Sequence, residues 1–290
     1  MNRYINAVYV FIILLMIFGC EDPVKKIDWD YHEMPPKLII NGKITNEYKQ
    51  HEILITQTQQ YDDSRAFKGI EDCDVRVHAG TTSYEYHAVG SHPGLYRSAI
   101  AFAGTRNQQY ELEIYPPDNN EYPDVITATE TMPDGVDIHQ AAAYITDTYE
   151  YEDTVEMSLM VYYEGSSEKP VNNYFIQYIV RQDEVPPALN LDILTSEEYM
   201  EEDSVRIAYF GYFDYYQAGE SIDVVVKTIT ETHFRFLEGV RRISEPGDIF
   251  GFSTPIGNAQ GNLNEGDVLG FFSTEYESTK KVAIISYAMK

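Results

Sequence analysis

Tyr110-Glu111-Leu112-Glu113-Ile114-Tyr115 is the stretch that indicates most directly how this chain folds. Apolar side chains at Tyr110, Leu112 and Ile114 alternate with the carboxylates of Glu111 and Glu113. Because successive residues of a β-strand point to opposite faces of a sheet, the alternation predicts a strand with one buried and one wet face. The stretch therefore favours an all-β fold.

Short β-branched and aromatic runs lie on both sides of this strand. Gly, Pro, Asn and Asp separate the runs at the spacing typical of sandwiches and barrels. The candidate strands are 37–44, 51–56, 74–78, 82–88, 110–115 and 125–129. Six or seven strands over this length predict an immunoglobulin-like β-sandwich at residues 37–133.

The second half of the chain has the same style with longer elements. Met132-Pro133-Asp134-Gly135 is the clearest punctuation between the halves, so we expect a second β-rich, sandwich-like domain at residues 134–290. Its candidate strands are 154–163, 173–181, 206–213, 221–230 and 281–287. One helix is predicted at 231–243, where Phe234 and Leu237 recur at helical spacing.

The amino terminus has the pattern of an export signal. Arg3 and the unbroken apolar run from Val8 to Phe18 precede Gly19-Cys20. This run is much shorter than the roughly 20 residues of a membrane-spanning helix, so residues 1–19 are predicted to be a cleaved signal peptide. A permanent transmembrane anchor is the alternative.

Ile17-Phe18-Gly19-Cys20 resembles the bacterial lipobox, which implies signal-peptidase recognition at Ile17, Phe18 and Gly19 and lipidation of Cys20. Several acyl chains hold a protein stably in a bilayer, since each buried methylene contributes about 0.8 kcal/mol. Residues 20–36 lack apolar periodicity and are expected to form an acidic, polar tether. The acidic residues directly after Cys20 resemble the signal that sends Bacteroidota lipoproteins to the cell exterior.

The net charge limits the kinds of partner. Without residues 1–19 the chain loses only Arg3 of its 21 basic residues, which leaves 20 against 47 acidic ones and a charge of −27. Nucleic-acid binding draws most of its affinity from basic side chains on phosphates. We therefore expect no nucleic-acid partner and no docking of the folded body on anionic lipid.

Familiar catalytic motifs are absent from the sequence: there is no Gly-rich phosphate loop, His-Glu-x-x-His, Cys-x-x-Cys or Gly-x-Ser-x-Gly. We expect no enzyme, no cofactor and no metal. A metal site at His78 and His87 and a calcium site in the acidic runs 147–153 or 197–203 are the alternatives. Cys73 lies among carboxylates, which raise a thiol pKa, so it is interpreted as a small buried or half-buried residue at the start of a strand.

Tyrosine is abundant, with 25 residues, and aromatic side chains crowd the stretch 209–216. Aromatic rings suit both strand packing and partner interfaces. The candidate partner-binding aromatics are Tyr209, Phe210, Tyr212, Phe213, Tyr215 and Tyr216.

Several strings, in a fixed order, resemble a Bacteroidota outer-membrane lipoprotein family, domain of unknown function 4249 (DUF4249). They are Pro36-Lys37-Leu38-Ile39-Ile40-Asn41-Gly42, Gly94-Leu95-Tyr96, Tyr110-Glu111-Leu112, Thr129-Glu130-Thr131-Met132-Pro133, Gly257-Asn258, Gly261-Asn262-Leu263 and Leu269-Gly270-Phe271-Phe272. The resemblance implies a non-enzymatic accessory of a TonB-dependent transporter in nutrient capture or gating. A structural or adhesive envelope protein with a Tyr-rich face, and a hydrolase with a carboxylate pair, are the alternatives.

Overall fold

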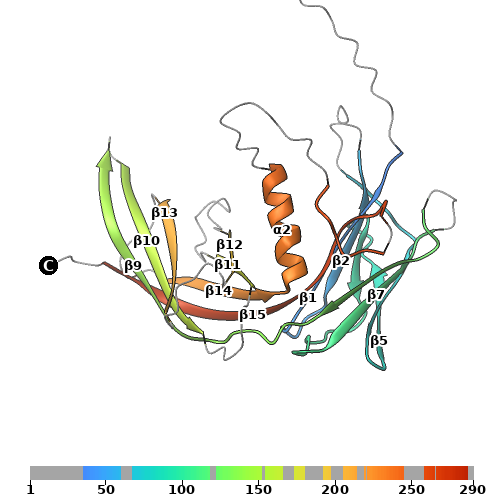
Figure 1. The fold of residues 1–290 in the computed structure, drawn as a ribbon, viewed down its shortest axis with the longest axis horizontal. Helices are drawn as coiled ribbons and strands as arrows, with labels where there is room; N and C mark the ends of the chain where they lie inside the picture. The colour runs from blue at the N-terminus through green and yellow to red at the C-terminus, as the bar shows by residue number, and fades with distance from the viewer. Residues whose placement is uncertain are drawn as a thin grey trace, which may run out of the picture. The chain divides into compact units, whose positions relative to one another are not determined.

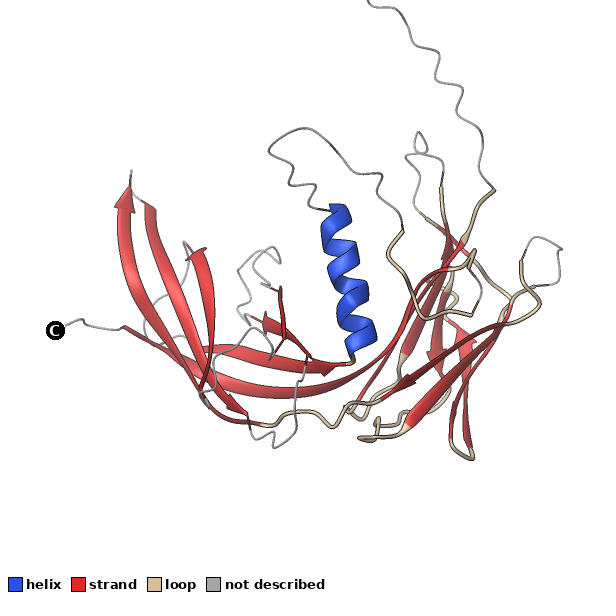
Figure 2. Cartoon of the chain, in the orientation of Figure 1, coloured by secondary structure: helices blue, strands red, loops and turns tan. Residues whose placement is uncertain are grey.

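The structure is a computed structural model, and it describes residues 35–59, 67–117, 122–151, 154–165, 173–179, 192–196, 205–213, 219, 221–244, 258–264 and 266–286. The chain divides into two compact units, 1–35 and 36–290, and every strand and helix below belongs to the second unit. The described part is mostly strand, with one helix (Figures 1 and 2). Within that part no helix is long and apolar enough to cross a membrane.

Eight strands come first along the chain and form one hydrogen-bonded sheet. They are β1 Leu38–Thr45, β2 Glu52–Gln57, β3 Lys68–Gly69, β4 Asp74–Ala79, β5 Thr82–Ala88, β6 Leu95–Ser98, β7 Gln109–Tyr115 and β8 Ile126–Thr131. We call these eight strands the amino-terminal sheet. In the strand order β15-β1-β2-β6-β5-β4-β7-β8, the last strand of the chain, β15 (Leu269–Ser286), lies next to β1.

Most of the remaining elements are longer, and β11 and β12 are the exceptions. They are β9 Ile138–Tyr151, β10 Thr154–Gly165, β11 Asn173–Ile179, β12 Asp192–Ser196, β13 Val205–Phe213, β14 Ser221–Ile229, α2 Glu231–Ser244 and β15 Leu269–Ser286. The helix expected at 231–243 is confirmed within a residue. β7 follows the expected alternation, with Tyr110, Leu112 and Ile114 buried.

β15 connects the two halves of the chain (Figure 1). Its residues 269–275 pair in parallel with β1, residues 276–283 pair antiparallel with β14, and residues 284–286 pair in parallel with β9. The all-β expectation is confirmed. The immunoglobulin-like detail is not, because the strands follow one continuous mixed path through β15.

The core of the amino-terminal sheet also contains residues from the end of the chain. Ile40, Ile53, Leu112 and Ile114 are fully buried there, and Phe272 of β15 joins the same cluster with no exposed surface. A Cβ on Gly42 would lie 3.0 Å from the Phe272 ring. Gly42 therefore leaves room for Phe272, its register partner across the β1-β15 pair.

The segment expected to separate two domains is attached to β14 and β15. The Val136 amide donates to Thr228 Oγ1 at 3.1 Å, and the Ile138 amide donates to Ser278 Oγ at 2.9 Å. Asp137 accepts from Tyr276 Oη at 2.7 Å and from Arg106 at 2.8 Å. That the chain divides into two independently folding domains at residues 133–134 stays a prediction. Residues 136–138, just after this boundary, are held by hydrogen bonds to β14 and β15.

Gly270→Ala should destabilise the protein strongly. Gly270 has φ 103°, and a Cβ there would lie 1.9 Å from the Ile40 carbonyl oxygen. Strain and the displaced β1-β15 pair should together cost about 2–4 kcal/mol of unfolding free energy, measured by urea titration.

Gly266→Ala is the matched control, because nothing lies within 4 Å of its Cβ position. It should stay within about 0.5 kcal/mol of the parent. Equal urea midpoints for the two variants would contradict the account of Gly270.

Candidate functional site

The first turn of α2 lies near a group of charged side chains, of which Lys227 and Glu275 are buried, and its sequence explains why the helix begins there. Thr230 Oγ1 accepts from the His233 amide at 3.2 Å, as an N-cap does. Glu231 is in the first turn and pairs with Arg235 one turn later, and Arg241 and Arg242 lie in the last turn. An acidic residue near the helix N-terminus and basic residues near its C-terminus both interact favourably with the helix dipole. The Glu231–Arg235 pair adds an attraction between successive turns.

His233 is buried in this turn, as is its neighbour Phe234. Its ring stacks on Phe271 of β15 with centroids 4.8 Å apart, and Phe236 packs on the same ring at 5.0 Å. Burial lowers the pKa of His233 from 6.5 to about 4, although the nearby Glu275 acts in the opposite direction. His233 is therefore neutral at physiological pH.

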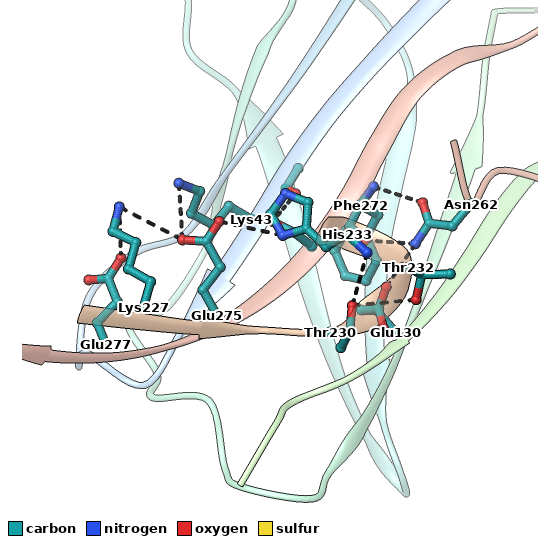
Figure 3. Close-up of polar contacts among 12 residues, drawn as sticks. Lys43, Glu130, Lys227, Thr230, Thr232, His233, Asn262, Phe272, Glu275 and Glu277 are labelled. Atoms are coloured by element: carbon teal, nitrogen blue, oxygen red, sulfur yellow. Dashed lines mark hydrogen bonds and ion pairs between the residues drawn. The ribbon is translucent and has the colours of Figure 1, made fainter. Parts of the chain in front are cut away.

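Two lysines and two glutamates lie to one side of His233 on neighbouring strands, with Glu275 next to its ring (Figure 3). Lys43 Nζ lies 3.3 Å from Glu275 Oε2, and Lys227 Nζ lies 3.8 Å from the same oxygen. Lys227 Nζ also lies 3.5 Å from Glu277 Oε1. We call Lys43, Lys227, His233, Glu275 and Glu277 the α2 charge cluster.

The charges within the cluster balance. Two ammonium groups face two carboxylates, and His233 Nδ1 lies 3.9 Å from Glu275 Oε1, which is beyond a hydrogen bond. The side chains of Glu275 and Lys227 are only 4% and 9% exposed, so each depends on the other for compensation of its lost hydration. The arrangement places His233 of the first helical turn beside charged side chains of β1, β14 and β15.

A second buried carboxylate holds the same helix end. Glu130 of β8 lies near Thr230 and 3.4 Å from Asn262 Nδ2. Burial raises its pKa, while hydrogen bonds from Thr131, Thr230 and Asn262 favour the charged form. A carboxylate beside a helix N-terminus is favourable, so Glu130 links β8 to the start of α2.

Most of the sequence-predicted site residues lie outside the described residues. These are Ile17, Phe18, Gly19, Cys20, Tyr215, Tyr216 and the acidic run 197–203. Tyr209, Phe210, Tyr212 and Phe213 lie on β13, where the described backbone pairs with β10. The register shifts between Ser158 and Met160, so a bulge falls opposite this aromatic stretch.

The structure does not bring His78 and His87 together. His78 Nε2 contacts Glu113 Oε2 of β7 at 3.2 Å, whereas His87 pairs in register with Arg97 of β6. No group of three or more metal-ligating side chains occurs among the described residues. Cys73 is half-buried, and burial raises its pKa, in the direction expected from the sequence.

Sequence reasoning missed the α2 charge cluster, although one signal for it exists. Lys227 follows the continuous apolar run Val224-Val225-Val226, and a charge within such a run indicates a buried partner. The partners Glu275 and Glu277 are about fifty positions away, and no local pattern connects them to Lys227.

Comparison with known proteins finds one family. The model described as Domain of unknown function (DUF4249) matches residues 24–281. No curated protein matches the chain.

Stability should fall as the pH is lowered from 6.5 to 4, and His233 should account for part of the loss. Since its folded-state pKa is about 4 and its ordinary value 6.5, the unfolded chain binds a proton in this window and the folded chain does not. At about 1.4 kcal/mol per pH unit, the loss reaches roughly 3 kcal/mol at pH 4.

Urea titrations at pH 7, 5.5 and 4 measure this loss. His233→Gln should lose less stability than the parent over this range, and His92→Gln, at an exposed position, should lose as much as the parent. A parent-like loss in His233→Gln would contradict the assignment.

Lys227→Met should be far more damaging than the loss of a surface ion pair. It leaves Glu277 and part of Glu275 uncompensated in a buried site, which costs about 3–5 kcal/mol. Arg97→Met breaks the exposed pair with Glu52 and should cost under about 1 kcal/mol. Thermal unfolding of both variants provides the comparison, and similar losses would show that the cluster is not buried in solution.

Proposed function

The chain belongs to the DUF4249 family, and from this premise we propose that it is a non-enzymatic, lipid-anchored outer-membrane protein that assists a TonB-dependent transporter in nutrient capture or gating. Family membership rests on the match over residues 24–281. The accessory role follows from what the family resemblance implies, and the anchor follows from the sequence around Cys20.

The observation that carries the proposal is the spacing between the lipobox-like cysteine and the compact unit. That unit begins at Pro36, so residues 21–35 separate Cys20 from it. A fully extended chain spans at most about 3.3–3.6 Å per residue, which gives a reach of roughly 50 Å. The tether expected from the sequence would therefore let the folded body dock on a neighbouring membrane protein without contacting lipid.

Three carboxylates near α2 have structural contacts. Glu130 and Glu275 are buried and Glu277 is half-buried, and each contacts groups on α2, β14 or β15 or next to them. The family strings supply similar contacts: Gly42 makes room for Phe272, and Asn262 contacts Glu130. We infer that partner recognition uses residues outside these strings.

Affinity capture from detergent-solubilised membranes tests the proposal. The tagged parent should carry acyl mass at its amino terminus and should retain an outer-membrane transporter barrel. Cys20→Ser should lose the acyl mass, leave the membrane fraction and recover the barrel at least tenfold less well. Cys73→Ser, the matched control at the other cysteine, should behave like the parent.

Two results would contradict the proposal. An intact, unacylated amino terminus in the parent would remove the anchor. An acylated parent that repeatedly captures no barrel, but attaches cells to a surface or polymer, would favour the adhesive alternative with its aromatic stretch 209–216.

A further inference from the structure

We propose that residues 258–264 and 266–277, here called the strap, close the amino-terminal sheet, so that β1 to β8 are stable only after this carboxyl-terminal segment has docked. The inference concerns the folding unit and does not depend on the proposed function. It rests on two sheet edges and on two asparagine side chains.

The first edge is β1, which β15 covers. Seven residues of β1, Ile39 to Thr45, pair in parallel with Leu269 to Glu275. Phe272 lies in the core of the sheet and is fully buried. Val268, the residue before the paired segment, is also buried in this core. Without the strap, β1 would lose a hydrogen-bonding neighbour and the core would lose a large apolar side chain.

The second edge is β8, and the same segment covers it. Leu263 forms a bridge with Ala128. The Asn264 amide donates to the Thr127 carbonyl at 2.9 Å, and the Thr127 amide donates to Asn264 Oδ1 at 2.8 Å. The strap thus contacts both ends of the strand order that begins at β1 and ends at β8.

Two asparagine side chains hold β15 in register. Asn262 Oδ1 accepts from the Phe272 amide at 3.0 Å, and Asn262 Nδ2 donates to the Phe272 carbonyl at 2.8 Å. In the same way, Asn46 Oδ1 accepts from the Glu277 amide at 2.6 Å, and Asn46 Nδ2 donates to the Glu277 carbonyl at 3.0 Å. Each side chain bonds both backbone groups of one β15 residue, as a neighbouring strand would.

The closing contacts join distant parts of the chain. Asn46 and Glu277 are 231 positions apart. The chain must therefore lose the entropy of closing this long loop before the contacts that compensate for that loss can form. A chain emerging amino terminus first has two uncovered edges until the strap is available. It therefore stays unfolded until nearly all of it has been made or exported.

Hydrogen exchange on the intact chain, read by mass spectrometry, tests the strap. In the parent, amides of β1, β4 and β7 should share one protection factor with residues 269–275, because they open together. Asn262→Ala leaves the Phe272 amide and carbonyl without partners and should lower protection by about tenfold or more across residues 38–131. Gly266→Ala, also in the strap, should match the parent.

Asn46→Ala is the second variant, because it leaves every strap residue unchanged. It should lower protection in 38–131 and 269–275 together, even where Asn262→Ala yields no folded protein. Loss confined to residues 258–286, with parent-like protection in 38–131 for either variant, would overturn the proposal.

Discussion

The parallel pairing of β1 with β15 is the constraint on which the rest of the structure depends. The two faces of β15 serve different layers. Phe272 and Tyr276 pack with the core of the amino-terminal sheet, whereas Phe271 and Glu275 contact α2 through His233. Since side chains alternate with a period of two, a slip of one residue would exchange these two sets. It would place Glu275 in an apolar core and Phe272 under His233.

Several separate contacts keep that register. Gly270 permits the close approach to Ile40. Asn262 bonds the backbone of Phe272 within the segment paired with β1, and Asn46 bonds the backbone of Glu277 just after it. Beyond it, the Arg106 guanidinium lies 4.1 Å from the centre of the Tyr276 ring, whose hydroxyl donates to Asp137. The linker between the sequence halves thus fixes β15 as well, so the two halves share one strand.

The sequence predicts the strands and the helix that have a regular local pattern of apolar residues. The alternation at Tyr110, Leu112 and Ile114 and the helical spacing of Phe234 and Leu237 correspond to β7 and α2. It cannot predict that a strand at residue 269 pairs with one at residue 39, because pairing depends on edges that form only in the folded sheet. For the same reason the α2 charge cluster was missed, since its members come from β1, β14, α2 and β15.

The family resemblance is confirmed, but the physical role of the strings that carry it becomes visible only in the structure. Gly42 leaves room for Phe272. The Tyr96 hydroxyl donates to the Ile70 carbonyl and accepts from the Cys73 amide.

The α2 charge cluster helps to determine the position of the helix. An apolar stripe alone is a weak determinant of the position of α2, because Phe234 is its only buried apolar side chain among the described residues, Leu237 is half-buried and Val240 is exposed. Buried ion pairs add little net stability when they replace well-packed apolar side chains, but they are costly when mismatched. A one-turn displacement would move His233 away from Phe271 and would remove the hydrogen bond from Thr230 that favours the charged form of the buried Glu130. The contacts of the first helical turn therefore penalise the wrong positions of α2, and the contact with Phe271 does so through β15, the strand that closes the amino-terminal sheet.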